Sequence, residues 1–113
     1  MTDVVLINVE EGIKRVMNNT KLYAKLLSKF KIDPNMKNIE EAFEAGDIEK
    51  AKASVHTLKG LSSNLSFIEL TSKTLQLENK IKAGSLDSNS LADVKNIYDL
   101  TITEADKVIA QYA

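Results

Sequence analysis

The sequence is poor in the residue types that support several common kinds of function. Its 113 residues contain no cysteine, no tryptophan, one histidine, one proline and four glycines. Without cysteine the chain forms no disulfide, has no thiol nucleophile and cannot hold zinc or haem through sulfur. A single histidine also argues against a di-iron or histidine-rich metal centre. The scarcity of proline and glycine favours helices throughout the chain.

Length, charge and hydropathy narrow the class of protein further. A chain of 113 residues with 43% hydrophobic residues can form one domain with a core. The formal net charge of −1 gives no indication of general nucleic-acid binding. The apolar run over residues 4–7 is far shorter than the ~20 residues that span a bilayer, and no basic stretch precedes it. We therefore expect a single, monomeric and cytoplasmic domain over residues 1–113 that does not bind membranes. The compact length favours a free-standing protein, and a domain cut from a larger protein is the alternative.

Apolar periodicity and capping residues predict three helical segments in the first part of the chain. A short N-terminal helix begins after Asn8, which has the side chain of an N-cap residue. A second apolar stripe runs over residues 21–30 and is interrupted at Pro34. The stripe resumes over residues 36–43, so these two segments should lie nearly end to end.

Three longer elements follow in the second part. Asp47 is placed to cap a helix over residues 48–65. Ser66 and Glu69 have the spacing of a capping box, which predicts that Ser66 starts the next helix. A heptad-like apolar pattern predicts a last helix from about Leu91. Together the elements predict an all-α fold, an antiparallel four-helix bundle with a short extra N-terminal helix.

The helix over residues 48–65 carries the only histidine, His56. Its core stripe follows steps of three and four residues and consists of Ile48, Ala51, Val55, Leu58, Ser62 and Leu65. His56 is rotated about 100° from Val55, so its ring should be exposed at the edge or outside of the bundle. The residues that share its face are Lys52, Lys59, Gly60 and Ser63.

The neighbours of His56 suit the acceptance of a phosphoryl group. Gly60 costs roughly 1 kcal/mol relative to alanine in a helix interior, so it needs another reason to be there. Bare backbone one turn from the imidazole would let another molecule reach the ring. Lys59 would supply a positive charge beside an anion on a ring nitrogen. Without such neighbours, a lone helical histidine is more often a surface residue with no chemical role.

Glu78 is predicted to face His56 from the next helix. The core stripe of that helix contains Leu77, and Glu78 lies one step off it, as His56 does on its own helix. In an antiparallel hairpin that turns near residue 65, positions equidistant from the turn meet. We therefore expect the Glu78 carboxylate within hydrogen-bonding reach of Nδ1 of His56, directly or through one water.

These residues resemble the histidine-containing phosphotransfer (HPt) domain of two-component phosphorelays. The resemblance covers about residues 8–112 and rests on HTLKG at 56–60, Asn64-Leu65, Leu77-Glu78 and the segment 44–47 before the histidine helix. The chain differs at Ser66, where the family often has glycine, and at Val55, where it often has alanine. The predicted capping box would explain Ser66 locally, and Val55 would alter packing under the histidine.

The resemblance implies that His56 takes a phosphoryl group from the phospho-aspartate of one receiver domain and passes it to another. Nε2 would be the nucleophile, and Glu78 would accept a hydrogen bond from Nδ1–H. Lys59 would offset charge on the phosphoryl oxygens, and Gly60 would keep the docking surface clear. The partners implied are receiver domains and a sensor or hybrid histidine kinase. Candidate docking residues are Lys52, Leu61, Ser63, Phe67, Ile13 and Met17.

The resemblance also implies a protein that is not itself a kinase. No glycine-rich phosphate loop is present, so no ATP site is recognisable. Mg²⁺ and the acidic pocket would come from the receiver, because the chain shows no clustered ligands; we expect no cofactor or metal of its own. One alternative is a helical adaptor that docks receivers without transfer, against which His56 itself argues. A weaker alternative is a haem-binding bundle with His56 and Met17 or Met36, although nothing places either methionine opposite His56.

Overall fold

The computed structural model describes residues 5–113, which form six helices joined by short loops. The helices are α1 (Val9–Arg15), α2 (Thr20–Lys31), α3 (Asn35–Ala45), α4 (Ile48–Asn64), α5 (Ile68–Lys82) and α6 (Ser88–Tyr112). The predicted all-α bundle with a short N-terminal helix is therefore confirmed. The first four residues, including the start of the predicted apolar run at 4–7, lie outside the described part. No helix of the described part is long and apolar enough to cross a membrane.

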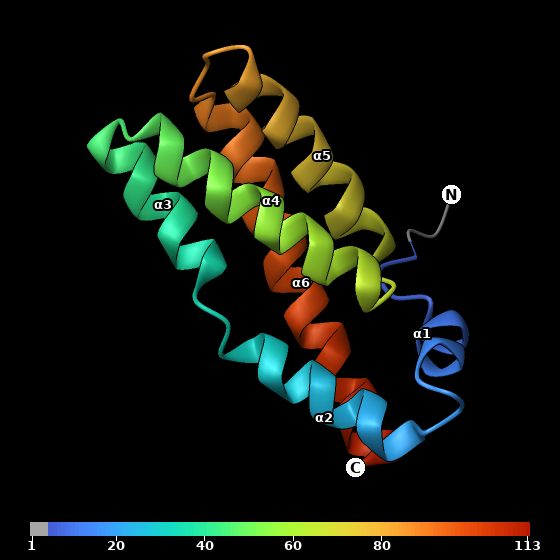
Figure 1. Ribbon diagram of the computed structural model, residues 1–113. Helices are drawn as coiled ribbons and strands as arrows, with labels where there is room; N and C mark the ends of the chain where they lie inside the picture. Colours follow the sequence, from blue (N-terminus) through green and yellow to red (C-terminus); the bar gives the residue numbers. More distant parts are fainter. Residues whose placement is uncertain (1–4) are drawn as a thin grey trace, which may run out of the picture.

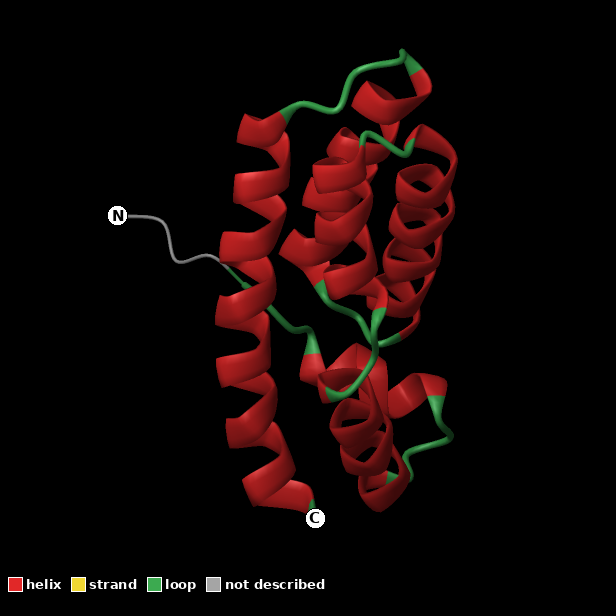
Figure 2. Ribbon diagram, turned by 90° about the vertical axis from the view of Figure 1, so that its left-hand side faces the viewer, coloured by secondary structure: helices red, strands yellow, loops and turns green. Residues whose placement is uncertain are grey.

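The long helix α6 packs against helices in both halves of the molecule. In Figure 1, α4 lies between α3 and α5 with α6 behind them, and these four helices form a bundle. Figure 2 shows that α6 extends past this bundle, where α2 packs against its C-terminal half. Helices α2 and α3 follow one another along the molecule, as the interruption at Pro34 predicted. Fully buried members of the shared core include Tyr23, Leu27, Ile39, Leu58, Leu70, Leu77 and Val94.

Two aspartates fix where α4 and α6 begin. The Asp47 side chain accepts a hydrogen bond from the backbone N–H of Lys50 at 3.0 Å, which caps α4 as predicted. The last helix begins at Ser88, three residues before the predicted start at Leu91. Asp87 causes this earlier start, because its side chain caps the first turn of α6.

The turn between α4 and α5 is not the predicted capping box. Ser66 has a φ of 61°, in the left-handed region, and the N-cap residue of α5 is Phe67. The backbone N–H groups of Ser66 and Phe67 donate to the carbonyls of Ser63 and Ser62, so this turn closes the C-terminus of α4. The Ser66 hydroxyl donates to the Glu11 carboxylate on α1 at 3.2 Å. Ser66 therefore has a backbone conformation that favours glycine.

One residue of the predicted core stripe on α4 is exposed. Ile48 keeps 39% of its surface accessible, whereas Ala51, Val55 and Leu58 are fully buried. The cause is position, because Ile48 is the first residue of α4, at the edge of the molecule where the chain turns from α3. Periodicity predicted the correct face but could not show where the covering helices end.

The short helix α1 is attached to the bundle through the α4–α5 turn and α2. An isolated antiparallel bridge joins Ile7 to Phe67. Gly12 packs directly against the ring of Tyr23 on α2, and the Tyr23 hydroxyl donates to the Leu65 carbonyl at 2.8 Å. Together with the hydrogen bond between Ser66 and α1, these contacts place α1 beside the C-terminal end of α4 (Figure 1).

Candidate functional site

The histidine of α4 and the glutamate of α5 meet as the hairpin geometry predicted. Nδ1 of His56 lies 2.9 Å from Oε2 of Glu78. The His56 side chain is 72% exposed, whereas the Glu78 side chain is 1% exposed. The ring thus stands on the surface and is held from beneath by a buried carboxylate. This arrangement fixes one ring nitrogen and leaves the other, Nε2, accessible to another molecule.

Electrostatics keep the buried carboxylate ionised. Burial by itself raises the pKa of Glu78, but hydrogen bonds from Lys59 and His56, together with the charges of Lys59 and Lys82, hold this pKa below its ordinary value of 4.5. Nζ of Lys59 donates to Oε1 at 2.6 Å, and Nζ of Lys82 lies 3.8 Å from the same oxygen. An ionised carboxylate can only accept hydrogen bonds, so Nδ1 of His56 carries the proton. The lone pair of the neutral ring is then on Nε2, the atom a phosphoryl acceptor needs.

Gly60 is exposed on α4, one turn from His56. A Cβ atom at this position would meet no atom within 4 Å among the described residues. Packing within the chain therefore does not require glycine here. Its effect is to keep the surface beside the ring free of a side chain, which agrees with the predicted approach path.

A pocket of about 420 Å³ lies beside the histidine ring, between α4 and α5. It is lined by Glu49, Lys52, Ala53, His56, Glu78 and Lys82. Its two lysines come from different helices, Lys52 from α4 and Lys82 from α5. The sequence alone did not identify Lys82 as a site residue. The signal for Lys82 was its position four residues after Glu78, which places both side chains on the same face of α5. Within residues 5–113, no group of three or more acidic or histidine side chains could hold a metal ion.

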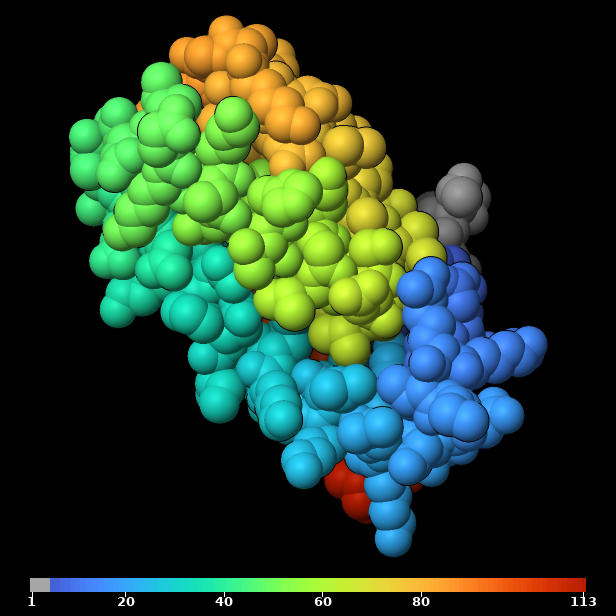
Figure 3. Space-filling view, in the orientation of Figure 1, coloured from blue at the N-terminus to red at the C-terminus, as the bar shows by residue number. Residues whose placement is uncertain are grey.

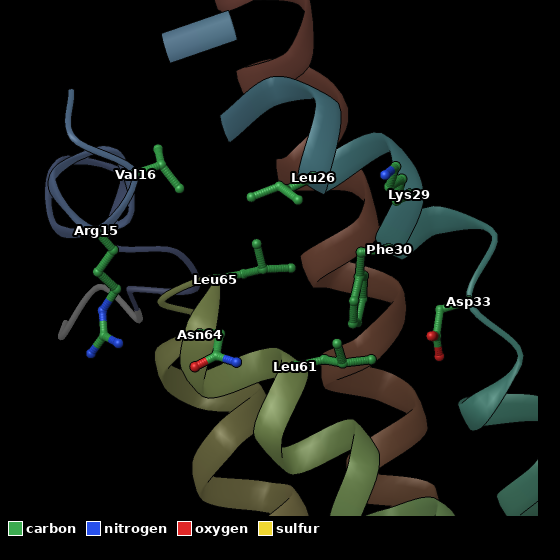
Figure 4. A pocket seen from close by; sticks show the side chains of 9 residues that line it. All are labelled: Arg15, Val16, Leu26, Lys29, Phe30, Asp33, Leu61, Asn64 and Leu65. Carbon is green, nitrogen blue, oxygen red and sulfur yellow. The ribbon is translucent and has the colours of Figure 1, made fainter. Parts of the chain in front are cut away.

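A larger apolar groove opens on the same helix, towards α1 and α2. Its volume is about 540 Å³, and Figure 3 shows the surface hollowed between the yellow-green end of α4 and the blue α2. Figure 4 shows the side chains that line it, which are Arg15, Val16, Leu26, Lys29, Phe30, Asp33, Leu61, Asn64 and Leu65. Leu61 is five residues after His56, or about 7–8 Å along the helix axis. An apolar surface thus begins within one to two turns of the histidine.

The predicted docking residues lie in different environments in the structure. Leu61 lines the groove, and Lys52 and Ser63 are exposed on the histidine face. Phe67 is fully buried, with its ring edge-on to Phe30 at 4.9 Å, so the prediction that it contributes to an exposed docking surface is wrong. The turn places Phe67 immediately after the left-handed Ser66, and its side chain therefore faces inward.

Ile13 and Met17, the two predicted docking residues in and after α1, do not line the groove. Ile13 is half-buried and lines a different pocket, together with Tyr112 at the end of α6. Met17 is 91% exposed in the turn after α1. Val16, directly after the last residue of α1, is the apolar side chain that this part of the chain contributes to the groove. Sequence patterning of a single short helix could not show which residue near its end faces α4.

Comparison with known proteins agrees with this geometry. A family model described as the Hpt domain matches residues 31–105, more than half of the chain, and the chain belongs to this family. Hpt domains perform phosphotransfer in two-component phosphorelays and act as intermediates without a kinase ATP site. Neither a search of curated proteins nor a search of solved structures found a match.

Proposed function

We propose that His56 is the phosphoacceptor of this Hpt domain. It takes a phosphoryl group from the phospho-aspartate of one receiver domain and passes it to the aspartate of another. The observation that carries the proposal is the 2.9 Å contact between Nδ1 of His56 and the buried Glu78 carboxylate, on a ring that is 72% exposed. The contact fixes the tautomer and directs the nucleophilic nitrogen outward.

The transfer step follows from this tautomer. The Nε2 lone pair attacks phosphorus and forms the P–N bond, while the P–O bond to the partner's aspartate breaks and its electrons leave with the carboxylate. Nδ1 keeps its proton, so the ring gains a positive charge. The ionised Glu78 carboxylate stabilises this charge through the hydrogen bond it already accepts. The return step to another receiver reverses these bond changes.

The partner of this reaction is a receiver domain that docks over Gly60 and the apolar groove. Gly60 leaves the backbone beside the ring uncovered, and Leu61, the next residue, lines the groove. The receiver supplies the phosphorylated aspartate and the Mg²⁺ that its transfer chemistry uses. A sensor or hybrid histidine kinase stands upstream as the origin of the phosphoryl group.

A labelling experiment with a variant of the acceptor tests this proposal. Purified wild-type chain is incubated with a phosphorylated receiver domain, and the phosphate that it gains is tested for the acid lability and base stability of phosphohistidine. We expect labelling of the wild type, and no labelling of His56→Gln at unchanged helical content. Thr57→Ala is a matched control, because Thr57 is the adjacent exposed residue. Labelling of His56→Gln at the wild-type level would refute the assignment of the acceptor.

A further inference from the structure

Two lysines face each other on one side of the His56–Glu78 contact. Lys52 lies one turn before His56 on α4, and Lys82 lies one turn after Glu78 on α5. Because α4 and α5 are antiparallel and His56 is level with Glu78, Lys52 and Lys82 are level with each other. Both are exposed, and both line the pocket beside the ring. Two cations, one from each helix, therefore line the same pocket as the His56 ring.

Lys59 lies on the other side of the contact and is already engaged. Its Nζ donates to Oε1 of Glu78 at 2.6 Å, and its side chain is only 27% exposed. The described residues that line the pocket do not include Lys59. A charge-assisted hydrogen bond to a buried carboxylate is strong, and moving Lys59 onto a phosphate would leave Glu78 less compensated.

The other two cations are much easier to recruit. Nζ of Lys82 is 3.8 Å from Oε1 of Glu78, beyond hydrogen-bonding distance, and this side chain is 54% exposed. Lys52 takes part in no ion pair within the described residues. Either side chain can turn towards an anion on the ring without breaking a short hydrogen bond.

We propose that Lys52 and Lys82 hold the phosphoryl group on Nε2 of His56, and that Lys59 is a positioning residue that acts through Glu78. The inference rests on the proposed function of His56. A phosphoryl group brings up to two negative charges and three acceptor oxygens, which match two facing ammonium groups. Glu49 also lines the pocket, but it lies two turns before His56, about 10 Å along the helix, at the far end.

A small phosphodonor tests these roles without the docking of a partner. The full chain is incubated with phosphoramidate, whose P–N bond breaks as ammonia leaves and a new P–N bond forms at Nε2. The rate of phosphohistidine formation is compared for Lys52→Ala, Lys82→Ala, both together and Lys82→Arg. We expect each alanine variant to be slower by about 1.5- to 5-fold, as for the loss of a partly exposed charge pair, and the double variant to be slower still. Lys82→Arg should restore the rate.

Two further variants separate these roles from general effects of charge. Lys107→Ala removes the same charge from an exposed position near the end of α6 and should leave the rate unchanged. Lys59→Ala should raise the pKa of Glu78, because the largest contribution that lowers it is lost. Lys59→Ala also removes the short hydrogen bond that holds the Glu78 carboxylate in place, so ¹⁵N NMR of His56 should show the tautomer preference weakened in Lys59→Ala but retained in Lys82→Ala.

The outcomes distinguish this inference from the proposed function. The inference is overturned if Lys52→Ala and Lys82→Ala match Lys107→Ala while Lys59→Ala slows acceptance with an unchanged tautomer. That result would assign the phosphoryl group to Lys59 and leave His56 as the acceptor. If His56→Gln is labelled as fast as wild type, the proposed function itself fails.

Discussion

At the scale of single residues, the site depends on the buried carboxylate of Glu78, which contacts His56, Lys59 and Lys82. Glu78 is 1% exposed and contacts His56 through one oxygen and Lys59 through the other. A buried charge is stabilising only when it is well paired. The same pairing keeps the carboxylate ionised, and this ionisation keeps the proton on Nδ1 of His56. The contacts that stabilise the buried Glu78 carboxylate are therefore the same contacts that keep the proton on Nδ1 of His56.

Substitution of Glu78 should slow phosphotransfer without abolishing it. In Glu78→Ala the nucleophile remains but loses the group that orients it, and we expect a rate lower by about 10-fold or more, as for partners that orient other functional histidines. Glu78→Gln should be milder, because the amide oxygen still accepts the Nδ1 hydrogen bond. Transfer from a phosphorylated receiver is the measurement. Equal rates in wild type and Glu78→Ala would show that the contact does not contribute to transfer.

Substitution of Gly60 should block a protein donor but not a small one. A side chain at this position enters open space, so Gly60→Gln should preserve the fold and gain up to about 1 kcal/mol of helix propensity. The added side chain would cover the surface over which a receiver approaches His56. We expect transfer from a receiver to fall strongly while labelling by phosphoramidate stays at the wild-type rate. Unchanged transfer from the receiver would contradict the role of Gly60.

At the scale of elements, the position of α1 decides the shape of the groove. Arg15 at the end of α1 and Val16 directly after it lie in the groove wall, but α1 has only seven residues, too few to be stable alone. Its contacts with Tyr23 and Ser66 therefore hold one side of the groove.

Gly12→Ala should weaken this attachment. The added Cβ would lie 2.5 Å from a ring carbon of Tyr23, which is fully buried and cannot easily move. We expect the free energy of unfolding to fall by about 1–3 kcal/mol, as for other overpacked positions. Gly60→Ala is the matched control, since it places the same methyl group in open space and should stabilise by up to about 1 kcal/mol. Denaturant unfolding of both variants measures the difference; a stabilised Gly12→Ala would contradict the close packing.

Ser66→Gly should stabilise the α4–α5 turn. A non-glycine residue in the left-handed region costs roughly 1–2 kcal/mol, and glycine removes this cost. The loss of the hydrogen bond from Ser66 to Glu11 reduces the gain, so we expect a net increase of up to about 1 kcal/mol in the free energy of unfolding. Ser66→Ala loses the hydroxyl but keeps the strain, and it should be less stable than wild type. If Ser66→Gly is the less stable of the two, the turn is not strained.

At the scale of the whole molecule, Glu78 links stability to pH. Its pKa is lower in the folded protein than its ordinary value of 4.5. The carboxylate therefore stabilises the fold fully above that ordinary pKa, and this contribution is lost as the pH falls through the folded pKa. The difference in unfolding free energy between wild type and Glu78→Gln should be constant near neutral pH and should shrink from about pH 5 downward. A difference that does not change with pH would show that the pKa of Glu78 is not lowered by folding.

Local sequence was sufficient to predict the helices and the exposure of His56. Periodicity fixes which face of a helix is apolar, and His56 lies one residue past Val55, off the buried stripe of α4. Asp47 marks the start of that helix through its own side chain. The hairpin register then follows from the position of the turn, and it was enough to place Glu78 opposite His56.

Features that depend on how elements pack were decided only by the tertiary structure. The sequence placed a capping box at Ser66, but the chain closes α4 there with a left-handed residue, and this turn buries Phe67. The groove exists only where α1 and α2 meet α4, so its wall at Val16 and the exclusion of Ile13 could not be predicted from one helix at a time. Sequence spacing fixes relations within an element, whereas contacts between elements depend on turn geometry and packing angles that spacing does not encode.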